Sequence, residues 1–271
     1  MPENFGDADY SGLPAYGQFD VIPATALPER MSQYEYLIFV GYHVMTEEIY
    51  QNLVTYVKGG GNLLLSAAHL KTDASRPQGS RLVFDGQVEA LLGCRLADRG
   101  GKINSGVKFC AESAMPGVIL PKTGNLDCDP ICAGGFYRIA EAELCGAEPA
   151  ALYTDTFFQE QDADKCPAVL QNRIGGGTVM LSLNLDYPGS PAVWPLYGML
   201  IRSVLAGSRR VCGVQVFASD RVSYAVYEEN GKKTVCLLNT DYNVSQEVRI
   251  RLPWKSITTE LAPLELKLVE E

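Results

Sequence analysis

The feature that most constrains the fold is a strand–helix–strand pattern over residues 34–68. The short apolar run YEYLIFVG (34–41) is typical of a buried strand, and NLLLSAA (62–68) is a second such run. Between them Thr46 can cap a helix over EEIYQNLVTYVK, and the glycines at 59–61 can end it. Since two strands joined through a helix lie parallel, the segment predicts a βαβ unit of a parallel sheet.

Later segments predict further elements of the same domain. Residues 100–165 contain short strand-like pieces between Gly, Pro and Asp, which indicates an irregular or antiparallel insertion. AVLQNRI (168–174) and TVMLSLNL (178–185) flank a glycine turn and predict a hairpin-like pair. A helix is expected over 195–207, where Gly207 ends it.

From about residue 210 onward the chain contains only strand-like segments. Asn230-Gly231 is a strong hairpin signal. The run from Val244 to Leu252 alternates along a strand and leaves Ser245, Glu247, Arg249 and Arg251 on the polar face. We therefore predict an α/β, flavodoxin-like domain over 1–207 and a small antiparallel β-sandwich over 208–271.

Composition excludes several classes of protein. The 271 residues are 46% apolar, and the longest apolar runs fall short of the ~18 residues that a membrane helix needs. A net charge of −9 disfavours nucleic acid and anionic membranes as partners. The polar, glycine-rich start, MPENFGDADYSG, suggests that the chain begins partway through a longer protein.

The eight cysteines are spread along the chain, and several lie in apolar runs. We therefore expect reduced thiols and a cytoplasmic protein. Cys128 and Cys132 form an isolated C-x3-C that lacks a second ligand pair, so a loop is favoured over zinc there. No metal and no cofactor are predicted.

Polar residues follow three predicted strands, at the edge where ligands bind in open α/β sheets. His43 follows the first strand, Ser66 and His69 end the second, and Asp186 follows a third. A histidine pair with a carboxylate can transfer protons or bind metal, although hydrogen bonding to loop backbone is the commoner role. These four residues are candidate ligand-edge positions.

Other catalytic patterns are weak. Ser66 lacks the flanking glycines of a nucleophile elbow, and the glycine triplets at 59–61 and 175–177 precede strands instead of following them. The acid pairs Asp127/Asp129 and Asp162/Asp164 lie in polar loop stretches and do not form a convincing glycosidase dyad. No catalytic residue is assigned.

Aromatic residues near turns are candidates for stacking on sugar rings. Tyr187, Trp194 and Trp254 are the candidate positions, with domain packing as the alternative role.

The run FDVIPATALPERMSQYEYLIFVGYHVMTEEIYQNLVTYVKGGGNLLLSAAHL resembles the class I glutamine amidotransferase-like domain. In particular, it is similar to the version that follows the catalytic barrel in family 42 β-galactosidases. GGGTVMLSLNLDYPGSPAVWPLYGMLIRSVL is similar to the end of that domain, and VSYAVYEENGKKTVCLLNTDYN is similar to the small β-sandwich that ends such proteins. The resemblance implies a trimer and a carbohydrate-active parent protein.

The departures from that family bear on chemistry. The place of the amidotransferase cysteine reads LLLSAAHL, and the place of its His-Pro-Glu motif reads NLDYPG. Nucleophile and base are both missing, and a catalytic barrel alone needs about 250 residues. We therefore expect a non-catalytic accessory and oligomerisation region of a glycoside-hydrolase-like protein. The alternatives are a carbohydrate-binding module and a divergent hydrolase using His43, His69 and Asp186.

Overall fold

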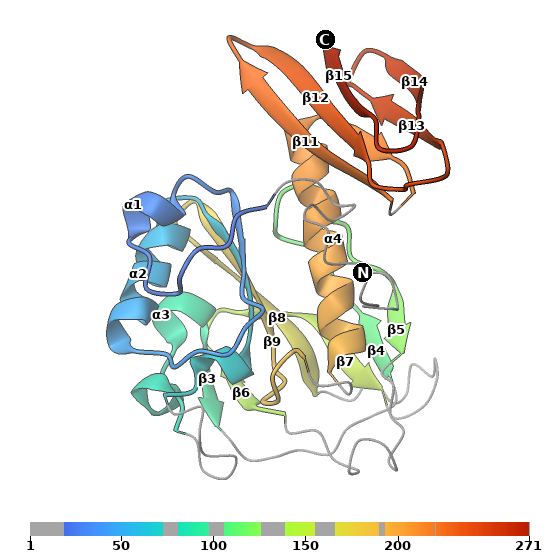
Figure 1. Ribbon diagram of the computed structural model, residues 1–271. Coiled ribbons are helices and arrows are strands. Elements are labelled where there is room, and N and C mark those ends of the chain that lie inside the picture. Colours follow the sequence, from blue (N-terminus) through green and yellow to red (C-terminus); the bar gives the residue numbers. More distant parts are fainter. Residues whose placement is uncertain are drawn as a thin grey trace. The chain divides into compact units, whose positions relative to one another are not determined.

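The computed structural model describes residues 19–72, 81–97, 106–125, 139–154, 166–189, 193–219 and 221–270 (Figure 1). The chain divides into two compact units. The first is Pro23–Val204, and the second joins the residues before Pro23 to those from Leu205 onward; α4 contributes residues to both. Two predictions concern residues outside the described ranges: the Cys128/Cys132 loop and the acid pairs at 127/129 and 162/164.

The first unit contains a mixed sheet of seven strands in the order β1-β2-β9-β8-β7-β4-β5. Its strands are β1 (Tyr36–Ile38), β2 (Asn62–Ser66), β4 (Gly106–Phe109), β5 (Thr123–Asn125), β7 (Glu148–Thr154), β8 (Pro167–Ile174) and β9 (Gly177–Ser182). Only the pairs β1–β2 and β2–β9 are parallel, and the remaining pairs are antiparallel.

The predicted flavodoxin-like α/β fold is therefore wrong. Ile174 pairs with Gly177, so β8 and β9 form a tight hairpin that leaves no room for a crossover helix. Within residues 100–165, strands β4, β5 and β7 extend the main sheet in antiparallel register. The residues that the structure describes contain more strand than helix.

The predicted βαβ unit is confirmed locally. Helix α2 (Glu47–Lys58) connects β1 to β2, and the Thr46 hydroxyl accepts a hydrogen bond from the Ile49 amide at 3.1 Å, as its N-cap. The apolar face of α2 is buried, and the helix lies on the opposite side of the sheet from α4 (Figure 1).

The other helices of the described chain differ in length. They are α1 (Pro28–Met31), α3 (Glu89–Leu92), α4 (Trp194–Cys212) and the 3-10 turns η1 (Ala67–Leu70) and η2 (Val83–Gly86). Helix α4 extends beyond the predicted end at Gly207, and the left-handed residue that follows it is Gly213, with φ +75°. In the described part of the chain, no helix is both long and apolar enough to cross a membrane.

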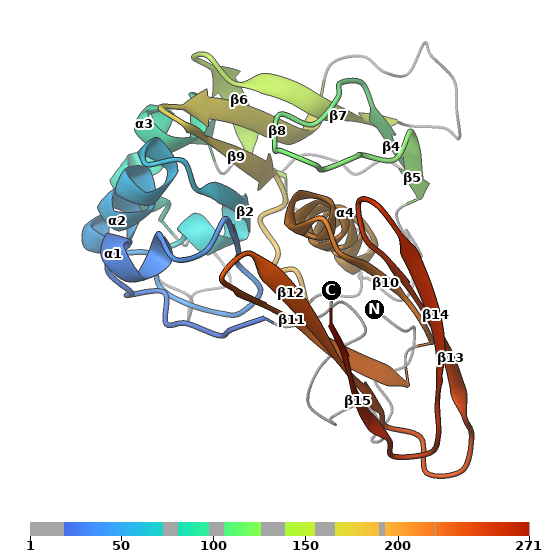
Figure 2. The same ribbon diagram turned by 90° about the horizontal axis from the view of Figure 1, so that it is seen from above.

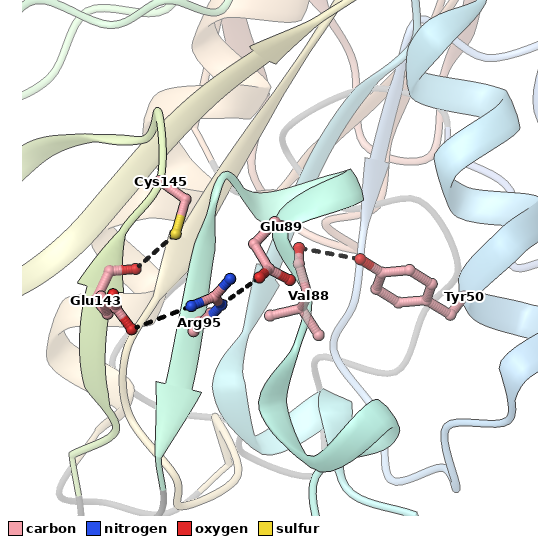
Figure 3. A network of polar contacts seen from close by, with 6 residues as sticks. All are labelled: Tyr50, Val88, Glu89, Arg95, Glu143 and Cys145. Carbon is pink, nitrogen blue, oxygen red and sulfur yellow. Dashed lines mark hydrogen bonds and ion pairs between the residues drawn. The ribbon is translucent and has the colours of Figure 1, made fainter.

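Strands β3 (Cys94–Ala97) and β6 (Glu141–Leu144) form a two-stranded ribbon. Polar contacts connect this ribbon to α3, and α3 to α2 (Figure 3). Arg95 bonds Glu89 of α3 and lies 3.7 Å from Glu143 of β6. The buried Tyr50 hydroxyl of α2 donates to the Val88 carbonyl at 3.0 Å and accepts from the Leu91 amide at 3.1 Å. These contacts link α2, α3 and the ribbon.

The second unit consists of two three-stranded antiparallel sheets. One contains β10 (Gln215–Phe217), β13 (Gln246–Arg251) and β14 (Ser256–Leu261), and the other contains β11 (Val222–Glu229), β12 (Lys232–Asn239) and β15 (Leu266–Glu270) (Figure 2). Residues of both sheets, including Tyr224, Leu237 and Ile250, share one core. The Asn230-Gly231 hairpin is confirmed, with φ +52° and +77° at its two turn residues.

Candidate functional site

The two histidines lie together at the carboxyl edge of the parallel strands. His43 follows β1, and His69 lies in η1, directly after β2. Their rings are stacked, with centroids 5.4 Å apart and planes 16° from parallel. Phe39 packs against both, at 4.8 Å from His43 and 5.4 Å from His69. Both histidines therefore lie at strand ends, where the sequence pattern predicts them.

Ser66 and His69 hold each other in a capping arrangement at the start of η1. The Ser66 amide donates to Nδ1 of His69 at 3.0 Å, and the Ser66 hydroxyl lies 3.4 Å from the same nitrogen. Because Nδ1 accepts a hydrogen bond, the proton of the neutral ring is on Nε2. Ser66 is only 1% exposed and His69 is fully buried, so neither side chain presents an atom to solvent.

Burial keeps this histidine pair neutral. Burial, with a smaller contribution from the neighbouring His43, lowers the pKa of His69 to about 3. Burial also lowers the pKa of His43, although the backbone of Gly41 and His69 offsets part of the effect. Among the described residues, neither Nε2 atom has a hydrogen-bond partner. Both rings are therefore uncharged at neutral pH.

The third strand exit adds Asp186 and Tyr187. The Tyr187 hydroxyl donates to the His43 carbonyl at 3.1 Å, and its ring meets the His69 ring edge-on at 5.8 Å. Asp186 is half-buried at the same exit. The predicted edge residues thus come from three strand ends, and Tyr187 ties the third to the first.

Two residues at this edge were missed from the sequence. Tyr42 packs against Tyr187 with ring centroids 4.1 Å apart and ring planes tilted by 43°, and it is 76% exposed. Lys71 is buried, donates to the Leu185 carbonyl, and lies 5.9 Å from the Tyr187 ring. The only sequence signal for Tyr42 is that it adjoins His43, whereas no pattern marks Lys71.

The predicted aromatic candidates do not form one group. Trp194 begins α4 and is half-buried; a Cβ at Gly198 would lie 3.2 Å from its ring, so the indole packs along the first turn of its own helix. Trp254 belongs to the second unit, where it is 59% exposed between β13 and β14. Tyr187 alone lies at the histidine edge.

The arrangement is poorly suited to nucleophilic catalysis. A serine nucleophile must touch its substrate, and Ser66 is enclosed in the core. The part of the chain that the structure describes also contains no cluster of three or more His, Cys, Asp or Glu that could hold a metal ion.

Comparison with known proteins identifies the fold. No family model and no curated protein matches the sequence. The β-galactosidase from Bacillus circulans sp. alkalophilus is 15% identical with a TM-score of 0.53, covering 88% of this chain and 33% of that chain. The β-galactosidase from Rahnella sp. R3 is 17% identical with a TM-score of 0.52, covering 89% and 32%.

A GH42 β-galactosidase from G. stearothermophilus is 16% identical with a TM-score of 0.47, covering 89% of this chain and 32% of that chain. The chain therefore spans about a third of the length of the enzymes it is similar to. Its fold is similar to that of part of the two β-galactosidases from Bacillus circulans and Rahnella. The amidotransferase-like part of the resemblance gains no support.

Proposed function

We propose that this chain is a non-catalytic accessory region of a glycoside-hydrolase-like, carbohydrate-active protein. The observation that carries the proposal is the enclosed Ser66–His69 pair, which fills the sheet edge where an α/β enzyme would bind its substrate. The fold shared with part of β-galactosidases supports the glycosidase context.

Assays of the purified chain on nitrophenyl glycosides and galacto-oligosaccharides test this proposal. We expect no turnover above buffer. Turnover that disappears in Asp186→Asn would overturn the proposal and favour a divergent hydrolase. Because Asp186 is half-buried, the thermal midpoint of the variant must match that of the parent chain.

The accessory role that we propose is self-association, with a trimer as the expected state. Strand β1 is an edge strand, and the chain after it exposes the apolar side chains of Val40, Tyr42 and Val44 at alternate positions. Exposed apolar residues beside a sheet edge are typical of contact surfaces. Light scattering should report a trimer that dissociates in Tyr42→Ser and persists in Tyr242→Ser, whose side chain is 77% exposed in the second unit.

A second candidate function is binding of a neutral saccharide. The observation that favours it is the exposed Tyr42 ring, packed at a tilt against Tyr187, since an exposed aromatic face can stack on a sugar ring. The same Tyr42→Ser variant separates the two functions. Loss of galactoside binding with an unchanged oligomeric state would favour the binding module, and the reverse result would favour the interface.

A further inference from the structure

The outer face of the sheet β10-β13-β14 carries a small surface pocket of about 120 Å³, lined by Phe217, Arg249, Arg251 and Ser256. Three strands contribute to it. Phe217 of β10 pairs in register with Arg249 of β13, and Arg251 pairs with Ser256 of β14. Because the two arginines are two residues apart on one strand, their side chains project to the same face.

The two guanidinium groups are available to a ligand. In the described residues, neither has a carboxylate within ion-pair distance. Arg249 instead lies over the Phe217 ring, 5.0 Å from its centroid. Glu247 lies on the same face of β13, two residues before Arg249, and pairs in register with Glu260 of β14, yet neither acid forms an ion pair with the arginines.

An aromatic side chain lies beside the arginines in the sequence. Arg251 and Ser256 close the β13–β14 hairpin, and Trp254, 59% exposed, lies in the turn between them. Paired guanidinium groups bind carboxylate, sulfate or phosphate oxygens, and an exposed indole offers its face to a sugar ring.

We propose that this pocket binds the acidic group of a saccharide, a uronate carboxylate or a sulfate ester, on Arg249 and Arg251. The hydroxyl of Ser256 donates a further hydrogen bond to the same oxyanion, and Trp254 stacks on the sugar. The choice of a saccharide rests on the proposed function, whereas the anion chemistry rests on the pocket alone.

The test is titration of the full chain with trigalacturonate, galactotriose and sodium sulfate, followed by calorimetry and by fluorescence of Trp254 in a Trp194→Phe background. We expect trigalacturonate to bind and to quench the indole, with affinity falling at high salt. The variant Arg249→Ala/Arg251→Ala should bind about tenfold more weakly, as loss of two exposed charge contacts implies. The control Arg221→Ala/Lys232→Ala removes the same charge from exposed positions of the second unit and should bind normally.

Each other outcome overturns the proposal in a distinct way. If sulfate bound as tightly as trigalacturonate, the pocket would be an anion site that does not recognise the sugar. Equal binding of galactotriose and trigalacturonate, unaffected by the arginine variant, would remove the anion site and leave the accessory function of the chain intact. No binding of any probe would remove the site altogether.

Discussion

The buried His69 should make the stability of the first unit depend on pH between 5 and 7. Its pKa is about 3 in the folded chain, against an ordinary value of 6.5. The unfolded chain therefore takes up a proton below pH 6.5 that the folded chain does not. Stability from this residue is fully present above pH 6.5 and is lost as the pH falls toward 3.

The size of the effect follows from linkage. At pH 5 the pH is 1.5 units below the pKa of His69 in the unfolded chain, so this residue is protonated there. In the folded chain His69 is still neutral. The free energy of unfolding therefore falls by about 2 kcal/mol relative to pH 7. His43 acts in the same direction, because burial lowers its pKa as well. The acids Asp85, Glu89 and Asp241 do not interfere above pH 5, since their pKa values are lowered from ordinary values of 3.8 to 4.5.

Urea unfolding at pH 7 and pH 5 measures this difference. In a Trp254→Phe background the remaining tryptophan, Trp194, reports on the first unit alone. His69→Phe should lower stability at pH 7 by about 1–3 kcal/mol, because the Ser66 amide loses its buried acceptor.

In the same variant, the difference in the free energy of unfolding between pH 7 and pH 5 should be smaller by about 2 kcal/mol. A merely structural role would lower stability equally at both pH values. A His69→Phe protein that keeps the full pH difference would refute the reasoning.

Three further predictions concern packing, polar burial and thiol reactivity. Gly177→Ala should destabilise by about 3 kcal/mol in urea unfolding, because its Cβ would lie 2.2 Å from the Gly61 carbonyl oxygen. Asn239→Ala should cost about 2–4 kcal/mol, since this buried amide donates to the Val244 and Ala262 carbonyls at 2.9 Å; an unchanged melting midpoint would contradict this. Iodoacetamide mapping by mass spectrometry at pH 8 should label the exposed Cys145 and spare Cys94, whose thiol pKa burial raises to about 12.

Local features of the fold were predictable from the sequence, but the pairing of distant strands was not. The cap at Thr46 and the Asn230-Gly231 turn depend on neighbouring residues, and both were predicted correctly. The direction of β4 and β7 depends on partners far away in the chain, which apolar periodicity does not encode. For that reason a real βαβ unit led to a wrong fold class.

The candidate site shows a similar division. Strand-end placement predicted that His43 and His69 share an edge, because parallel neighbours end side by side. Burial could not be predicted in that way, and burial decides what the residues can do. The Arg249–Arg251 face was visible as alternation, but the pocket needed Phe217 and Ser256 from two other strands.

The position of the histidine pair therefore argues against its use as a reactive centre. At the edge where α/β sheets bind ligands, this chain places Phe39, Tyr187 and Tyr197 around His69, all within 6.0 Å between ring centroids. A neutral, stacked and enclosed imidazole can pack and accept a backbone hydrogen bond, but it has no access to a substrate proton. The exposed groups that can meet a partner include Tyr42 in the first unit and the arginine pocket in the second. Function in this chain should therefore be sought at contact surfaces, and the edge that resembles an active site serves to hold the sheet together.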